Sequence, residues 1–304
     1  MMEEEKEGKR NGTPSGVDIS VLPEERISNI IALTSPKDVC RACTASPKFH
    51  AAAKSNAVWD RFLPSDYQAI IARSSSSSDL LVRGYLDAFF SSLNFCHSSL
   101  ITHHSSLITH HLKHPTPFGT ITHSSSLNIF HTVCGPHTCH LLYLTLFDNP
   151  ILIDDSNKSF FLEKSSSKKC YLLAARDLCI IWKVAELKSV RWFDICGKIP
   201  TSMLSPKTNY ATYLVFKLRR GAHGYKPPPK ASVGTNGEGE VFKQIQRISH
   251  PKLRKDGWFE IELGEIFNEG GEDDELKIRL LEVDTNIVKT SLIVEGIEIR
   301  PTKG

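Results

Sequence analysis

The sequence predicts an α+β multidomain protein in which a small N-terminal helical unit precedes an antiparallel β-sandwich. Two patterns indicate this fold class. Apolar residues recur at helical spacing between prolines in residues 18–72, whereas apolar and polar residues alternate as in strands in residues 143–304. Between them, residues 73–142 form a serine linker and a His/Ser/Thr-rich low-complexity insert. We expect this insert, like the polar N-terminus 1–17, to be disordered.

Composition and charge exclude several classes of function. The 304 residues have a formal net charge of +3, a balance that predicts no nucleic-acid partner. No run of about 18 apolar residues occurs, and the charged start lacks the apolar core of a secretory signal. We therefore expect no membrane association and a cytoplasmic or nuclear location, or both. The eight cysteines are expected to be reduced thiols that pack as small hydrophobes.

Helix-entry signals divide residues 18–72 into four short helices. Pro23 and two glutamates open the first helix. Residues 35–38 place a serine at the N-cap, a proline at the first helical position and an aspartate at the third. Ser46-Pro47 repeats this signal, and a fourth helix is expected to hold Trp59. A helical unit of about 45 residues is near the lower limit of independent stability, so we expect it to leave apolar surface for a partner.

The insert is unusually rich in histidine. Ten of the 13 histidines lie in residues 97–140, and the heptamer 98–104 is repeated at once as 105–111. Two interpretations stay open. The stretch is translated non-coding sequence, such as a retained intron, or it is a genuine linker whose histidines make it responsive to pH.

Strand patterns dominate the C-terminal part of the chain. The clearest segments are 210–218, 258–263, 276–280 and 292–299, the last with a bulge expected near Gly296. Turns rich in proline and glycine separate these short strands. Such a succession is typical of an antiparallel sandwich.

The helical segment resembles the F-box over nearly its whole length. The resemblance rests on Leu-Pro-Glu at 22–24, the isoleucines that follow, Pro-Lys-Asp-Val at 36–39 and the tryptophan. In that family such apolar positions pack against the Skp adaptor subunit, which links the protein to a cullin. The alternative is that they form the core of the unit itself, and some residues are expected to do both. The contact residues that the resemblance implies are Leu22, Pro23, Ile27, Ile30, Val39 and Trp59.

Residues 143–304 resemble the phloem protein two domain, which is related to the tobacco-type plant lectins. The matching residues include Lys-Lys-Cys-Tyr-Leu-Leu at 168–173, Trp-Phe-Asp-Ile at 192–195 and Gly-Trp-Phe-Glu-Ile-Glu-Leu at 257–263. The resemblance implies a lectin-like β-sandwich. It also implies a glycan ligand, especially one that contains N-acetylglucosamine.

The sequence departs from this family beside Trp182. Relatives have a Trp-rich stretch there, whereas here Lys183 alone leads on to Val184. Aromatic rings stack on the C–H faces of sugars, so the shortening removes candidate platforms for a sugar. The remaining candidates for carbohydrate binding are Trp182, Trp192 and Trp258. For the last two, packing in the core is the alternative.

No motif in the sequence indicates catalysis or a bound metal. The serine-hydrolase, phosphate-loop and zinc-protease signatures are absent. Cys40-x-x-Cys43 has no second ligand pair, and the Cys134–His140 cluster fits no closed zinc site. We therefore expect a non-catalytic protein without cofactor or metal.

The two resemblances together predict a substrate-recognition subunit of a Skp–cullin–F-box ubiquitin ligase. Its helices would bind the Skp adaptor subunit, and its sandwich would bind a glycoprotein or protein target. Two alternatives stay open: a carbohydrate-binding lectin without a role in a ubiquitin ligase, and a sugar-independent protein-interaction module.

Overall fold

The computed structural model describes residues 19–74, 138–180, 186–187, 189–225, 228–235, 241–244, 251–270, 274–283 and 286–302. Its helical elements are η1 (Ile19–Val21), α1 (Glu24–Ile31), α2 (Pro36–Ala45), α3 (Pro47–Ala52), α4 (Asn56–Asp60), α5 (Tyr67–Ala72), α9 (Thr138–Asp148) and η3 (Thr201–Met203). Among these described residues, no helix combines the length and the apolar character needed to cross a membrane.

The four predicted N-terminal helices are confirmed as α1 to α4, and their entry signals work as expected. The Ser35 hydroxyl accepts a hydrogen bond from the Asp38 backbone N–H at 3.2 Å, and Ser46 caps Lys48 in the same way. These bonds satisfy backbone donors that have no partner within the helix. Helix α5 was not predicted, and it packs against the first strand of the larger sheet.

The strands are β1 (Ile151–Ile153), β2 (Lys158–Leu162), β3 (Lys169–Ala174), β4 (Cys179–Ile180), β5 (Glu186–Leu187), β6 (Phe193–Pro200), β7 (Thr208–Leu218), β8 (Lys230–Thr235), β9 (Lys243–Gln244), β10 (Lys252–Leu253), β11 (Phe259–Asn268), β12 (Glu275–Glu282) and β13 (Leu292–Pro301). They form two antiparallel sheets. The larger has the order β1-β2-β3-β13-β7-β11-β10, with β5 also paired to β13, and the smaller has the order β4-β6-β12-β8-β9.

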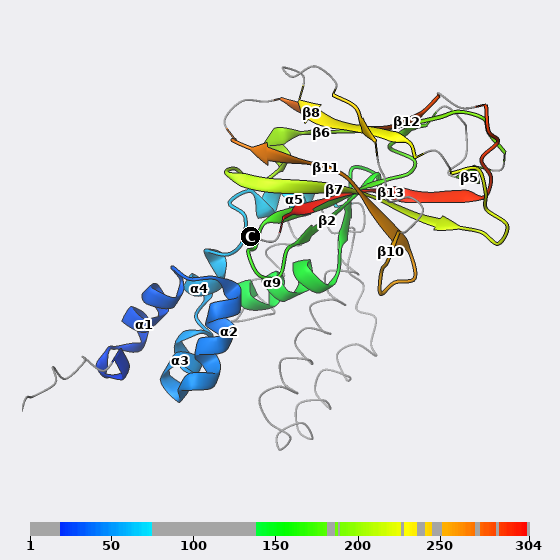
Figure 1. Ribbon diagram of the computed structural model, residues 1–304. Helices are drawn as coiled ribbons and strands as arrows, with labels where there is room; N and C mark the ends of the chain where they lie inside the picture. The colour runs from blue at the N-terminus through cyan, green and yellow to red at the C-terminus, as the bar shows by residue number, and fades with distance from the viewer. Residues whose placement is uncertain are drawn as a thin grey trace, which may run out of the picture.

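The two sheets pack face to face, as Figure 1 shows. A Cβ added at Gly197 of the smaller sheet would lie 3.1 Å from a side-chain carbon of Leu173 and 3.2 Å from one of Ile297, both in the larger sheet. The core between the sheets includes Phe193 and Phe216, which are almost completely buried. The predicted antiparallel β-sheet region is therefore confirmed.

The predicted alternation is confirmed in β12, where Leu276 and Ile278 are fully buried. The bulge predicted near Gly296 is confirmed in β13, where the register shifts between Val294 and Gly296. Strand β7 differs, because it is buried on both faces along most of its length. It is a central strand, paired with β13 on one side and β11 on the other, and part of its outer face is covered as well.

Helix α9 spans the boundary that the sequence suggested between residues 142 and 143. The helix runs across this boundary, and the first strand begins only at Ile151. It contacts both α4 and β2, and Figure 1 shows it between the helical unit and the sheets. Most of the predicted insert, residues 75–137, lies outside the described residues, and so does the predicted N-terminal tail 1–17.

Candidate functional site

The core of the N-terminal helices includes three of the six residues that the sequence proposed as partner contacts. Ile27 and Val39 are fully buried, and Trp59 is 2% exposed. The Trp59 indole N–H donates a hydrogen bond of 2.6 Å to the carbonyl of Ala53. Ser28 donates a further buried bond of 3.0 Å to the Ala52 carbonyl, so α1, α3 and α4 form one packed unit.

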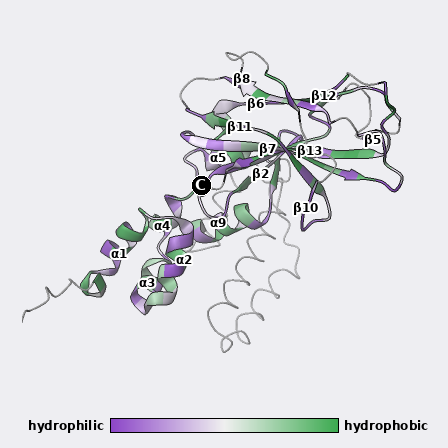
Figure 2. Cartoon of the chain, in the orientation of Figure 1, coloured by the Kyte–Doolittle hydropathy of each residue, from purple (hydrophilic) through white to green (hydrophobic). Residues whose placement is uncertain are grey.

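A set of large apolar side chains remains exposed on this unit. We call it the α1 patch and define it as Ile19, Val21, Ile30 and Leu33. Their exposed fractions range from 37% for Ile19 to 77% for Val21, with Leu33 at 68%. Figure 2 shows hydrophobic colour on α1 and on the turn that precedes it. The unit thus has a core of its own and a separate apolar surface, the kind of surface that marks an interaction site.

Helix α9 covers the opposite, inner part of the unit. The ring of His140 lies 4.3 Å from the Trp59 ring, centroid to centroid, and the ring of Tyr143 lies 5.2 Å from it. The Cys139 backbone N–H donates to the Asn56 side chain at 3.1 Å. Tyr143 also donates its hydroxyl to the carbonyl of Lys164, and burial raises the pKa of this phenol to about 12. One helix thus packs on the helical unit and on the sandwich together.

Charged residues join the same two parts of the molecule. The Lys169 ammonium in β3 lies 2.9 Å from the Asp66 carboxylate, next to α5. Arg73 binds Asp154 through two guanidinium nitrogens at 2.7 to 3.0 Å. Ser74 forms an antiparallel bridge with Ile153 of β1. These contacts hold the helical unit in one orientation on the sandwich.

The structure does not bring the predicted tryptophans together. Trp192 is 53% exposed and immediately precedes β6 of the smaller sheet. Trp258 is half-buried beside β11 of the larger sheet, where the Lys217 ammonium lies 4.1 Å from its ring centroid. Trp182 lies outside the described residues. Core packing is thereby ruled out for Trp192, whose ring is available to a ligand.

A buried ionic network on the larger sheet was not foreseen. Glu260 and Glu298 are each 5% exposed, and Arg254 and Arg300 bind the carboxylates of both. Burial opposes ionisation of Glu260, but hydrogen bonds from Arg300 and Lys252 outweigh it and lower the pKa to about 2. Glu260 and Glu298 lie far apart in the sequence, and their grouping depends on the pairing of β13 and β11 with β7.

The cysteine-containing motifs remain without a metal assignment. Cys40 is exposed and Cys43 half-buried, and neither forms a disulfide. Within the described part of the chain, no group of three or more His, Cys, Asp or Glu side chains is placed to hold a metal ion. Cys134 and His137 of the second motif lie outside the described residues.

Comparison with known proteins identifies both parts of the chain. The family model of phloem protein 2 matches residues 182–301. F-box protein PP2-B10 of Arabidopsis thaliana is 33% identical, with 93% of each chain covered. Putative F-box protein PP2-B12 of the same plant is 34% identical over 92% of this chain and 96% of its own length. This chain belongs to the F-box proteins of the phloem protein 2 type.

The resemblance of both segments is therefore confirmed. F-box protein At2g02240, also of Arabidopsis thaliana, is a further relative at 32% identity over 96% of this chain and 82% of its length. Among solved structures, a Podospora anserina GH26-CBM35 mannanase has a TM-score of 0.25 at 12% identity, covering 44% of this chain and 28% of that one. A likeness this low supports no inference about ligand.

The burial of the F-box residues divides the predicted adaptor contacts into two groups. Ile27, Val39 and Trp59 have almost no accessible surface, so they cannot touch a partner while the helices keep this packing. Their burial favours the alternative that they form the core of the unit itself. In the second group, Ile30 and Pro23 are exposed and Leu22 is half-buried. For these three, adaptor contact stays a prediction.

Three of the four residues of the α1 patch, Ile19, Val21 and Leu33, were not among the predicted adaptor contacts. Ile19 and Val21 precede α1, and Leu33 lies beyond its last residue. Such positions can be identified from the ends of a predicted helix, where side chains lie outside the face that packs inward.

Proposed function

We propose that this F-box protein is the substrate-recognition subunit of a Skp–cullin–F-box ubiquitin ligase and has no active site of its own. The observation that supports it most is the α1 patch. Leu33 is 68% exposed although Ile27, six residues earlier in the chain, is completely buried. A small unit with a complete core does not need four further exposed apolar side chains, and apolar anchors dominate the energy of protein interfaces.

The attachment of the F-box to the PP2 domain supports the same proposal. A ligase receptor holds its target near the conjugating enzyme, which is catalysis by proximity. Proximity is greatest when the connection between adaptor and target is stiff. The Asp66–Lys169 and Arg73–Asp154 pairs, together with α9, supply such a connection.

Binding to purified Skp adaptor tests the adaptor role. The double variant Ile30→Asp, Leu33→Asp places two charges in the α1 patch and leaves the core intact. We expect the affinity of the full chain for the adaptor to fall by at least about 30-fold, the effect of losing hot-spot residues. The matched control is Ile287→Asp, because Ile287 is 45% exposed on the PP2 domain against 41% for Ile30. Equal binding by the double variant and the wild-type chain would refute the proposal.

For the PP2 domain, we propose that the surface around Trp192 takes part in target recognition. Its exposed indole supports a role for stacking on a sugar or packing on a protein. Binding of the full chain to immobilised oligosaccharides of N-acetylglucosamine separates the two target classes. Retention that Trp192→Ala abolishes would favour a glycoprotein target. Absence of retention, with adaptor binding intact, would favour a sugar-independent protein target.

A further inference from the structure

Two cysteines lie directly opposite one another in the smaller sheet. Cys179 of the edge strand β4 pairs with Cys196 of β6 in antiparallel register. Residues opposite one another in such a pair point to the same face, with Cα atoms about 4.5 to 5.5 Å apart. Cysteines joined by a disulfide have Cα atoms about 4.4 to 6.8 Å apart. The register therefore places the two Cα atoms within the range that a disulfide spans.

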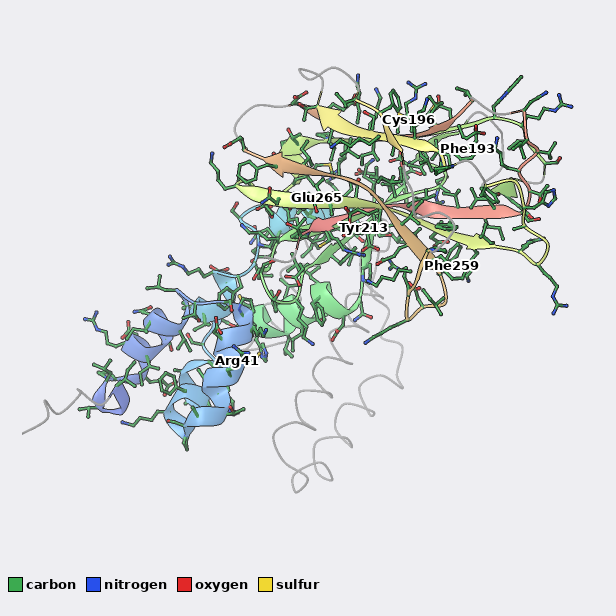
Figure 3. All side chains as sticks on the ribbon, in the orientation of Figure 1. Arg41, Phe193, Cys196, Tyr213, Phe259 and Glu265 are labelled. Carbon is green, nitrogen blue, oxygen red and sulfur yellow. The ribbon has the colours of Figure 1, made fainter. Side chains whose placement is uncertain are left out.

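The pair lies on the outer face of the sheet. Along β6, Phe193 and Ile195 are buried between the sheets, whereas Asp194 and Cys196 alternate with them and are only half-buried. Figure 3 labels Cys196 and Phe193 on this strand. Cys179 is exposed, and both cysteines are free thiols. A small reagent from solution can therefore reach the pair.

Positive charges flank Cys196. Arg279 of β12 lies opposite Cys196 on the side away from Cys179, and Lys198 follows two residues along the same face. Burial raises the pKa of the Cys196 thiol, and the nearby Asp194 carboxylate acts in the same direction, while Lys198 and Arg279 oppose both effects. Cys179 is the more accessible of the two, so it is the thiol that reacts first with a reagent from solution.

We propose that Cys179 and Cys196 form a reversible cross-strand disulfide by exchange with a low-molecular-weight disulfide such as oxidised glutathione. The Cys179 thiolate attacks one sulfur of the reagent, forming a mixed disulfide and releasing one thiolate. The Cys196 thiolate then attacks the Cys179 sulfur and releases the second thiolate. The two released thiolates take up the two protons that the cysteines lose, so one disulfide is reduced and one formed.

The second step is favoured by geometry. Because Cys196 faces Cys179 in the ladder, its attack is intramolecular and has a high effective concentration, which offsets its raised pKa. The product would fasten β4, a strand of two residues at the edge of the sheet, to the eight-residue strand β6. A disulfide in an exposed edge strand is open to reduction, so the bond is expected to be reversible.

Peptide mapping of the full chain tests the proposal. After incubation with oxidised glutathione and alkylation of free thiols, non-reducing trypsin digestion should yield peptides 177–183 and 192–198 as one linked species, since each contains one cysteine. Dithiothreitol should separate them. Cys196→Ser should accumulate glutathione on Cys179 instead. The matched control Cys40→Ser removes an exposed cysteine elsewhere and should leave the linked species unchanged.

A thermal measurement provides a second readout. The oxidised wild-type chain should unfold about 5 °C above the reduced chain, because closing a loop of this length restrains the unfolded state. Cys179→Ser should remove this difference. Glutathione adducts on the wild-type chain without the linked peptides, or linked peptides with no reversal by dithiothreitol, would overturn the proposal.

Discussion

The Lys169 ammonium lies 2.9 Å from the Asp66 carboxylate, and this pair joins β3 of the larger sheet to the segment between α4 and α5. The Lys169 side chain is only 8% exposed, whereas that of Asp66 is 44% exposed. A nearly buried ammonium requires a counter-charge, because desolvation without a partner is costly. The pair therefore fixes the position of the segment as well as stabilising the fold.

Removing the counter-charge should destabilise the chain. Asp66→Asn leaves Lys169 buried without its anionic partner, and we expect the free energy of unfolding to fall by about 2 kcal/mol. Equilibrium denaturation measures this change. Glu265→Gln, the same carboxylate-to-amide change at an exposed residue of β11, should alter it by less than about 0.5 kcal/mol. Equal effects of the two changes would mean that the Asp66 pair has no structural role.

Trp59 is predicted to act through stability and not through a direct contact. Trp59→Ala removes a ring that packs on His140 and Tyr143 and should cost about 3 to 5 kcal/mol in unfolding free energy. Leu33→Ala should cost less than about 0.5 kcal/mol, because the side chain is largely exposed. Chemical denaturation of each variant measures these two losses of unfolding free energy. If Trp59→Ala kept the stability of the wild type, the tryptophan would not be a core residue.

The ionic network should make the PP2 domain sensitive to acid. The pKa of Glu260 is lowered from 4.5 to about 2 in the folded chain. A lowered pKa contributes stability that is fully present above the unfolded pKa and is lost as the pH falls through the folded one. The loss should therefore occur between about pH 4.5 and pH 2. The lost contribution to the free energy of unfolding is on the order of 3 kcal/mol.

The variant Glu260→Gln isolates this contribution. The glutamine side chain cannot ionise. The free energy of unfolding of the variant should therefore fall short of the wild-type value most near neutral pH, and this deficit should shrink as the pH falls toward 2. Denaturation curves over this pH range measure the deficit. A deficit that does not change with pH would show that Glu260 stabilises the sheet by packing alone.

Gly296 is expected to tolerate no side chain. A Cβ at this position would lie 2.1 Å from the backbone carbonyl oxygen of Leu173 in the neighbouring strand. Gly296→Ala must therefore push β13 away from β3, and we expect a loss of about 3 kcal/mol in unfolding free energy. Glu295→Ala, at the exposed neighbouring position, is the control and should be nearly neutral. A stable Gly296→Ala chain would contradict the close approach of the two strands.

The local features of the fold could be predicted from the sequence. Ser35 and Ser46 mark helix starts because a cap depends on neighbouring residues only. The buried positions of β12 follow from simple alternation, because one face of that strand is packed and the other is not. Residues 22–39 also gave enough of the F-box pattern for the family to be identified.

Long-range features could not be predicted in this way. Helix α9 contains buried residues on several sides, such as Leu141, Tyr143 and Leu146, since it packs on both α4 and β2. A helix covered from two directions has no amphipathic period to detect. The separation of Ile27 from Ile30, one in the core and one in the α1 patch, likewise depends on how α1 packs on α3 and α4.

Hydrogen exchange of the full chain, with and without purified Skp adaptor, tests the central claim most directly. If the α1 patch is the docking surface, the adaptor should slow exchange of backbone amides in residues 19–33 and leave β6 and β12 unchanged. The Ile30→Asp, Leu33→Asp variant should show no such slowing. Slower exchange confined to the strands of the PP2 domain, or none anywhere in a chain that binds the adaptor, would contradict the claim.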